Sequence, residues 1–417
     1  MRKQQSLVQH YRLLIQLGFL GLVSVVAWRH QVLGGGPSGS APIDAICPFG
    51  ALETLYKYLA SGEYIQRLNV SNFILLGGAI ALVIVVGRYF CGWICAIGTL
   101  QDLARKVGQK FWRKVEIKVP EKIDQPLRYL KYGVLAWSLW ATWQTGTLVI
   151  RAYDPFAAYG HIFGWNWGEL WDEFAIGISI LLLSVLGSVF VDRIFCKYLC
   201  PLGAFLGLFS KISLFRIERE ESACINCKLC SRKCPVNIPV DTIKVVKSAE
   251  CIGCMSCVTT CPTGKVGTDH EGKIFLHSTI GGKVVSAGVV GLIGLALYVG
   301  VVGGAQLTGI WRSVPPSLEA AVAAGGQLDP ANIKGYMSLT EIATTFKVDL
   351  DKLYAELNLP RDKVPPETKA KEIRTLLGVT EEEFGPQKIR DAVAKMTGFA
   401  GAAADGEQGH SADKAKP

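Results

Sequence analysis

Eight of the thirteen cysteines stand in two short runs that share one spacing, and cysteine thiolates are common ligands for soft metals. In each run two residues separate the first three cysteines, three residues precede the fourth, and a proline follows. The runs are Cys224, Cys227, Cys230 and Cys234, and Cys251, Cys254, Cys257 and Cys261. Zinc sites usually place their cysteine pairs farther apart, and disulfides are rare in the cytoplasm. The spacing therefore favours iron–sulfur clusters over both alternatives.

This spacing is typical of bacterial ferredoxins with two [4Fe–4S] clusters. Three closely spaced cysteines wrap a tight loop around one cluster, and the proline after the fourth cysteine begins a new turn. In such proteins the fourth cysteine of each run ligates the other cluster. The expected ligand sets are therefore Cys224, Cys227, Cys230 with Cys261, and Cys251, Cys254, Cys257 with Cys234. Thiolates would fill every iron site, so these clusters would transfer electrons rather than bind a substrate.

Four further cysteines belong to an internal repeat. RYFCGWIC at residues 88–95 matches RIFCKYLC at 193–200, and CPFGA at 47–51 matches DPFAA at 154–158. Repeats in membrane proteins often place a site at their interface, and residues four apart share one face of a helix. We therefore expect that a third iron–sulfur centre could form at or just inside the membrane. Its ligands would be Cys91, Cys95, Cys196 and Cys200.

Other interpretations of these residues stay open. The four cysteines could instead pack as small apolar side chains or act as redox-active thiols. Cys47 and its repeat partner Asp154 could contact a cofactor or a quinone, or Cys47 could be an inert thiol. His30 and His161 could ligate a b-type haem or contact a quinone, although a lone histidine is more often structural. The sequence has no CxxCH motif, so it does not support covalent haem.

The composition indicates a membrane protein that also has polar domains. Half of the 417 residues are hydrophobic and the mean hydropathy is positive. A spanning helix needs about 20 mostly apolar residues. Five segments approach that length: Leu13–Trp28, Val70–Phe90, Tyr132–Ile150, Phe174–Val191 and Val284–Val302. The first has no small-residue cleavage site after it, so we expect a retained helix rather than a signal peptide.

The distribution of basic residues predicts how the chain is oriented. Nine lysines and arginines lie between the second and third segments. In contrast, residues 151–173, between the third and fourth segments, contain one basic residue, Arg151, and four acidic residues. The positive-inside rule then places the N-terminus, residues 100–131 and residues 205–280 in the cytoplasm of a bacterial-type plasma membrane, with the C-terminus outside. Leu100–Phe111 is amphipathic, either as a helix on the inner membrane surface or as a short soluble helix.

These motifs together resemble the NapH/NosR-type membrane polyferredoxins, over roughly residues 10–270. The resemblance lies in the CPFG segment, the paired RxFCxxxC elements, CPLGA at 200–204 and the two ferredoxin runs. It implies electron transfer between the quinone pool or a cytoplasmic donor and a redox partner protein, in a multi-subunit complex and without substrate chemistry. Ala96 stands where the family usually has proline, so we expect a less sharply broken helix there than at Pro201. The flavin domain of NosR-type members is not visible.

The predicted fold is mainly α: polytopic membrane helices, an inserted two-cluster ferredoxin domain and a small C-terminal helical domain. The expected domains are 1–204 (membrane repeats), 205–280 (ferredoxin), 281–303 (fifth span), 304–333 (linker), 334–399 (helical, extracytoplasmic) and 400–417 (disordered). In the tail we expect capping boxes at Ser338/Glu341 and Thr380/Glu383, and helices at Asp349–Leu357, Thr368–Leu377 and Pro386–Met396. A helix-turn-helix-like pattern there suggests DNA binding, but the predicted topology and balanced charge favour a docking domain and no nucleic acid.

Electron transfer in the lipid membrane is therefore the leading interpretation, as a quinol dehydrogenase-like subunit rather than a stand-alone catalyst. The apolar bilayer core is about 30 Å thick, so a carrier inside the membrane would shorten the path. The alternative is a maturation factor that reduces a metal or a thiol for another redox enzyme. That function would favour Met or His clusters on the outer face, and the chain has only four methionines. A transporter is disfavoured because the spans lack buried charges.

Overall fold

The computed structural model divides the chain into two compact units, each with its own hydrophobic core. The first comprises residues 1–32 and 41–313, and the second comprises 33–40 and 314–417. The structure describes residues 2–36, 39–62, 69–111, 119–164, 167–221, 224–262, 276–314, 330, 333–370, 372–379 and 384–398. The tail at 400–417, most of the linker 304–333 and the pair Thr380/Glu383 lie outside these residues.

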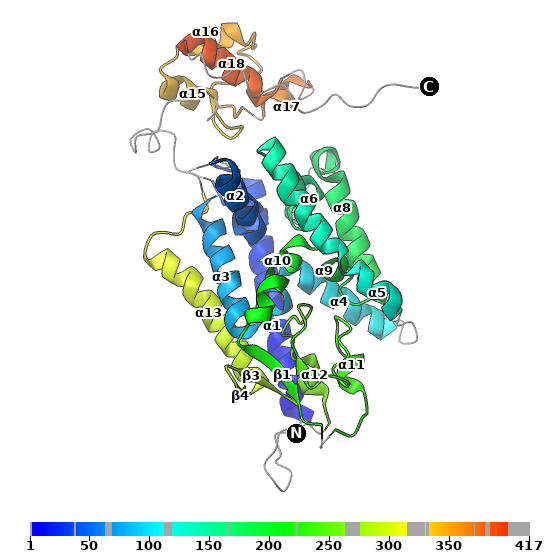
Figure 1. Ribbon diagram of the computed structural model, residues 1–417. Coiled ribbons are helices and arrows are strands. Elements are labelled where there is room, and N and C mark those ends of the chain that lie inside the picture. The colour runs from blue at the N-terminus through cyan, green and yellow to red at the C-terminus, as the bar shows by residue number, and fades with distance from the viewer. Residues whose placement is uncertain are drawn as a thin grey trace. The chain divides into compact units, whose positions relative to one another are not determined.

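Helices dominate the structure, which confirms the predicted fold class (Figure 1). The long helices of the first unit are α1 (Arg2–Leu33), α3 (Val70–Val86), α6 (Leu130–Thr145), α8 (Trp167–Phe190) and α13 (Ala287–Leu307). Among the described residues, three stretches are long and apolar enough to cross a membrane: Leu7–Leu33, Glu173–Phe190 and Ala287–Leu307. With 17 and 16 residues, α3 and α6 are shorter, so the count of five spans stays a prediction.

Large apolar side chains are exposed along the three longest of these helices. Leu14 on α1, Leu183 on α8 and Leu292 on α13 are each more than 60% exposed. Large apolar side chains exposed in this way are typical of helices that face lipid or a partner. Glycine ends α6 earlier than predicted, because Gly146 adopts a left-handed backbone (φ 67°) directly after Thr145.

Shorter elements connect the long helices. The helices are α2 (Pro48–Ser61), α4 (Ala96–Phe111), α5 (Glu121–Leu127), α7 (Pro155–His161), α9 (Ile194–Tyr198) and α10 (Pro201–Phe209). The short turns are η1 (Ile43–Ile46), η2 (Phe90–Ile94), η3 (Val149–Tyr153), η4 (Ile162–Gly164) and η5 (Ser210–Ile212). The amphipathic α4 packs on the end of α8, where Arg105 binds Asp192 at 3.1 Å. Part of the polar face of α4 therefore contacts the protein rather than water or lipid headgroups.

A small antiparallel sheet supports the ferredoxin segment. Its strands are β1 (Phe215–Arg219), β2 (Val245–Val246), β3 (Leu276–Ile280) and β4 (Lys283–Val285), in the order β2-β1-β3-β4. Two short helices, α11 (Leu229–Arg232) and α12 (Ser256–Thr260), lie in the two cysteine runs. Gly281 and Gly282 form the β3–β4 turn with positive φ, as a two-residue hairpin requires. The sheet therefore extends beyond residue 280, and α13 begins at Ala287 rather than at Val284.

The internal repeat is also visible in the backbone. Cys47 follows η1 and Asp154 follows η3, and both residues have extended backbones with ψ of 119° and 115°. Each directly precedes a helix whose first residue is proline, α2 or α7. Proline suits the first helical position because its missing N–H needs no partner there. The two residues thus occupy equivalent capping positions.

The second unit contains α15 (Leu339–Phe346), α16 (Leu350–Glu356), α17 (Ile373–Leu377) and α18 (Pro386–Thr397). Ser338 caps α15 as predicted, because its hydroxyl accepts a bond from the Glu341 N–H at 3.1 Å. The helix expected from Thr368 begins only at Ile373. Thr368 instead accepts a bond from the Leu339 N–H at 3.2 Å, so tertiary pairing overrides the local helical pattern.

Candidate iron–sulfur sites and the adjoining cavity

The four cysteines of the first predicted set surround one small cavity. Cys224, Cys227, Cys230 and Cys261 all line it. The connecting loop turns sharply because Asn226 and Lys228 have left-handed backbones, with φ of 53° and 57°. Cys224 and Cys227 are partly exposed, and Ile225 between them is 61% exposed. This site therefore lies at the surface of the ferredoxin segment.

The second predicted set surrounds a cavity of its own, lined by Cys234, Cys251, Cys254 and Cys257. Gly253 and Met255, with φ of 60° and 58°, repeat the left-handed turns of the first loop. Met255 is fully buried, so this site is the more enclosed of the two. Burial raises the pKa of Cys234 to about 12 and that of Cys251 to about 11. Such thiols become ligands when a metal displaces the proton.

Four cysteine thiols line each of these two cavities. In the described part of the chain, no group of three or more His, Cys, Asp or Glu side chains is gathered closely enough to hold one metal ion. All thirteen cysteines carry free thiols. Four thiols around a cavity suit a cube whose four irons each take one thiolate.

The structure also brings together the four cysteines of the internal repeat. Cys91 lies in η2 and Cys196 in α9, while Cys95 and Cys200 stand at the breaks that follow these elements. Cys200 interacts electrostatically with the other three thiols, and Cys95 interacts with Cys91 and Cys196. The predicted grouping of these residues in one site therefore has a structural basis.

The backbone at this site corrects two predictions. Cys95 and Cys200 have extended backbones, with ψ of 122° and 110°, so each pair spans a helix break rather than one helix face. The first break is no softer than the second, although Ala96 replaces proline. In both, the N–H of the second cysteine donates to the carbonyl five residues earlier, on Phe90 at 2.9 Å or Phe195 at 3.0 Å. At Cys95 this π-type bond ends the helix although no proline follows.

Two arginines at equivalent repeat positions flank the four thiols. Arg88 is 2% exposed and Arg193 is 1% exposed. Arg88 places Nη2 at 3.9 Å from the Cys91 sulfur and also interacts electrostatically with Cys200. Arg193 donates from Nη1 to the Cys91 carbonyl at 2.6 Å and interacts with Cys196. Both buried cations therefore face the repeat cysteines.

Nearby carboxylates only partly neutralise this positive charge. Asp102 binds both Arg12 and Arg193, and Glu250 binds Lys131. Among the described residues named here, the four cations Arg12, Arg88, Lys131 and Arg193 exceed the carboxylates of Asp102 and Glu250 by two charges. Buried uncompensated charge is costly, whereas an oxidised cubane with four thiolates is a dianion and would balance it. The sequence analysis did not predict these buried charges. The arginine that begins each RxFC element was a signal for Arg88 and Arg193.

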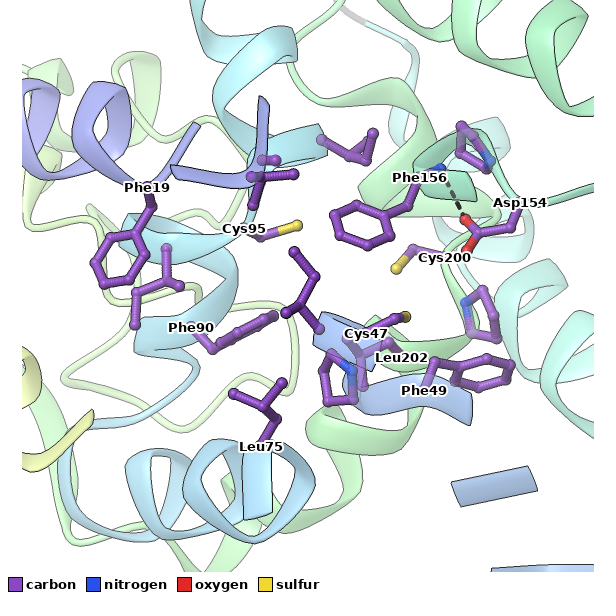
Figure 2. A pocket seen from close by; sticks show the side chains of 18 of the residues that line it. Phe19, Cys47, Phe49, Leu75, Phe90, Cys95, Asp154, Phe156, Cys200 and Leu202 are labelled. Carbon is purple, nitrogen blue, oxygen red and sulfur yellow. Dashed lines mark hydrogen bonds between the residues drawn. The ribbon is translucent and has the colours of Figure 1, made fainter. Parts of the chain in front are cut away.

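A largely apolar cavity of about 540 Å³ adjoins the repeat cysteines. Phe19 of α1, Leu75 of α3, Phe90 of η2 and Leu202 of α10 lie around it (Figure 2). Figure 2 shows the thiols of Cys95, Cys200 and Cys47 directed toward this space. The volume falls in the range of pockets that hold small organic ligands, and those pockets are mostly apolar with a few polar groups.

Cys47 and Asp154 supply polar groups to this cavity. The Asp154 carboxylate accepts a bond from the Phe156 N–H at 2.9 Å, as a helix cap. Burial raises the pKa of Asp154 to about 7, with Asp44 adding to the rise. Burial and the neighbouring Asp154 also hold the pKa of the Cys47 thiol well above its usual range. Cys47 and Asp154, which occupy equivalent positions in the repeat, therefore direct a thiol and a carboxyl group to the cavity that are protonated below neutral pH.

The histidines take no part in this cavity as described. His161 stacks on Phe174 with ring centroids 4.3 Å apart, and its Nε2 lies 3.3 Å from the Arg151 guanidinium. Neither His161 nor His30 is among the residues that line the cavity. The haem interpretation gains no support from this arrangement.

Comparison with known proteins points to the same cofactors. A "4Fe-4S binding domain" model matches residues 68–115 and 174–220, and a "4Fe-4S dicluster domain" model matches 216–262. The putative electron transport protein YccM of Escherichia coli is 29% identical over 281 residues, covering 66% of this chain and 76% of that protein. The uncharacterised protein MJ0750 of Methanocaldococcus jannaschii is 32% identical over 217 residues, covering 52% and 83%. The ferredoxin-type protein NapH of Haemophilus influenzae is 29% identical over 265 residues, covering 60% and 85%. No solved structure matches the chain.

The apolar helices, the cysteine sites and these matches define a membrane protein of electron transport that binds [4Fe–4S] clusters. The names NirI, MauN and NosR recur among its further relatives. The chain belongs to the NapH/NosR-type membrane polyferredoxins, which confirms the resemblance seen in the motifs. The two predicted [4Fe–4S] clusters are likewise confirmed.

Proposed function

We propose that the protein relays electrons between a soluble redox partner and a quinone, through three four-cysteine sites. The observation that carries this proposal is the succession of these sites in one unit. The exposed first set and the enclosed second set both lie in the ferredoxin segment, and the repeat cysteines adjoin the apolar cavity. Each site would accept and release one electron, and no substrate would bind to iron.

Two clusters would be held by the ferredoxin cysteines in the crossed sets predicted from their spacing. The cavities support these sets, because each is lined by three cysteines of one run and the fourth cysteine of the other. A third cluster would be held by Cys91, Cys95, Cys196 and Cys200. The excess of buried cations supports an anionic occupant there, since four protonated thiols would leave these charges uncompensated.

A quinone suits the adjoining cavity by chemistry and by size. An isoprenoid tail would contact the apolar side chains, which belong in part to helices able to span a membrane. Quinone reduction takes up protons as well as electrons. Asp154 could supply a proton, and the thiols of Cys95 and Cys200 mark the electron-donating side of the same space (Figure 2). Asp154 and Cys47 would therefore be quinone contacts.

The proposed topology follows from the basic loops of the sequence. The ferredoxin segment would lie in the cytoplasm, where the exposed first site could meet a soluble partner in a larger complex. The N-terminal end of α1 fits this placement, because Gln9 donates to the Cys254 carbonyl at 3.1 Å and so lies on the same side as the ferredoxin segment. The second unit would lie outside and dock a redox partner.

The test is electron transfer from the reduced protein to a quinone. Anaerobic protein in lipid nanodiscs would be reduced with dithionite and mixed with short-chain ubiquinone and menaquinone analogues, and cluster reoxidation would be followed by absorbance. Leu202→Trp should fill part of the cavity and slow reoxidation at subsaturating quinone by at least about tenfold, equivalent to about 1.4 kcal/mol of binding. Leu183→Trp is the control, because Leu183 is 69% exposed on α8 and does not line the cavity. Equal rates for wild type and Leu202→Trp would contradict the quinone site.

The maturation-factor alternative keeps one supporting observation. Cys47 lines the same cavity as Cys95, Cys196 and Cys200, so thiol–disulfide exchange among them is geometrically conceivable. That function predicts a disulfide between Cys47 and a repeat cysteine after mild oxidation. Mass spectrometry of the oxidised protein would detect it, and its presence together with the absence of a third cluster would favour the alternative.

A further inference from the structure

The loop of the second ferredoxin site lies directly against the turn that carries Cys91. Gly92 has no room for a side chain, because a Cβ there would lie 2.2 Å from the Ile252 carbonyl oxygen. The indole Nε1 of Trp93 donates to the Gly253 carbonyl at 2.9 Å. Ile252 and Gly253 stand between Cys251 and Cys254, so the two cysteine-bearing backbones touch.

Two buried cations also lie between these sites, and one of them, Arg193, interacts with a cysteine of each. Arg193 interacts electrostatically with Cys196 of the repeat and Cys254 of the second set. Lys197 follows Cys196 in α9, and it interacts with Cys234 of the second set. The Lys197 side chain is 1% exposed, and its ammonium has no hydrogen-bond partner within the described residues. Its nearest carboxylate, on Asp124, is 4.0 Å away.

The first ferredoxin site has different surroundings. Cys230 interacts electrostatically with Cys261 of its own set and with Asp241. Lys228 occupies the position in the first loop that Met255 occupies in the second, and it is exposed. Within the described residues, the contacts with the repeat that are given above, from Gly92, Trp93 and Arg193, are made by the second site.

We propose that the second ferredoxin site exchanges electrons directly with the repeat cysteine site, and that Lys197 is a positioning cation shared by both. This inference rests on the proposed function, because it requires a redox centre at the repeat cysteines. One electron leaves the reduced site, which becomes oxidised, and reduces its neighbour. No bond forms or breaks.

Removal of the shared charge has a defined consequence. Reduction adds negative charge to a site, and a nearby cation stabilises the reduced form. Lys197→Met keeps the length of the side chain without its charge, so the reduction potentials of both neighbouring sites should fall. A purely structural role for Lys197 would not shift two potentials together.

An anaerobic redox titration of the full-length protein, followed by EPR, tests this. In Lys197→Met the potentials of the second ferredoxin site and of the repeat site should both fall by about 59 mV, a tenfold change for a one-electron couple. The first site should not change. Lys228→Met is the matched control, because this lysine also follows a ligand cysteine and should affect only the first site. A shift in neither potential, or in the repeat site alone, would overturn the inference.

The wild-type protein provides a second measurement if the variant does not assemble. At potentials where both sites are reduced, spin–spin interaction should broaden the repeat-site signal together with that of the second ferredoxin site. A repeat-site signal without this broadening would overturn this inference but would leave the proposed third cluster in place. No repeat-site signal at any potential would overturn the proposed third cluster as well.

Discussion

Arg193 and Asp102 form a two-point ion pair in which Nε and Nη2 of the arginine each lie 2.7 Å from a carboxylate oxygen. The same carboxylate also binds Arg12 of α1. Burial alone would raise the pKa of Asp102, but the two arginines outweigh burial and hold that pKa well below its usual range. The carboxylate therefore stays ionised throughout the neutral pH range and joins α1, α4 and the start of α9.

Asp102→Asn should destabilise the first unit strongly. It leaves two buried guanidinium groups without their counter-ion, and breaking a buried pair in this way costs about 3–5 kcal/mol. Denaturant titration of the protein in detergent measures the change. Asp192→Asn is the control, since its partly exposed pair with Arg105 should contribute only about 1 kcal/mol. Similar losses for both variants would argue against a special role of Asp102.

Serine substitution of a repeat cysteine should remove one cluster and spare two. Cys91→Ser and Cys196→Ser each delete one proposed ligand of the third cluster, while the ferredoxin cysteines keep theirs. EPR of the reduced protein should then lose one signal and retain the ferredoxin pair. Cys47→Ser is the matched control and should retain all signals, because Cys47 is proposed to contact the quinone and not iron.

The [4Fe–4S] cofactors could be predicted from the sequence because the cysteine motif that binds them is local. The ligand sets follow from spacings of two and three residues, and the repeat follows from two matching segments. The sheet was missed because its pairing is distant, with Phe215 opposite Ile280. The same holds for the charges, since Arg12, Asp102 and Arg193 are about ninety residues apart in succession and meet only in the fold. The apolar cavity likewise could not be predicted, because its lining residues come from several helices and no single helix carries a sequence pattern for it.

Asp154→Asn should change the pH dependence of quinone reduction. With a pKa of about 7, Asp154 is protonated below neutral pH and able to donate, and it loses its proton as the pH rises. The wild-type rate should therefore fall through neutral pH. The variant should be slower by roughly 100-fold in the acidic range, the order that a positioned general acid contributes, and its rate should lose the dependence near pH 7. An unchanged profile in the variant would show that Asp154 is not the proton donor.

Ser338→Ala should loosen the second unit locally. Loss of the hydroxyl cap on the Glu341 N–H costs about 1 kcal/mol at a helix start. Hydrogen exchange of the full-length protein should show faster exchange in the first turn of α15 and no change in the ferredoxin segment. Thr344→Ala in the same helix should have a smaller effect, because its hydroxyl donates to the Thr340 carbonyl one turn earlier and caps no free N–H.

The iron and acid-labile sulfide content of anaerobically purified protein tests the central claim most directly. Three four-iron clusters predict about twelve irons and about twelve sulfides per chain, and EPR should resolve three centres on stepwise reduction. About eight irons, with only the two ferredoxin signals, would show that Cys91, Cys95, Cys196 and Cys200 hold no cluster and would contradict the proposed relay.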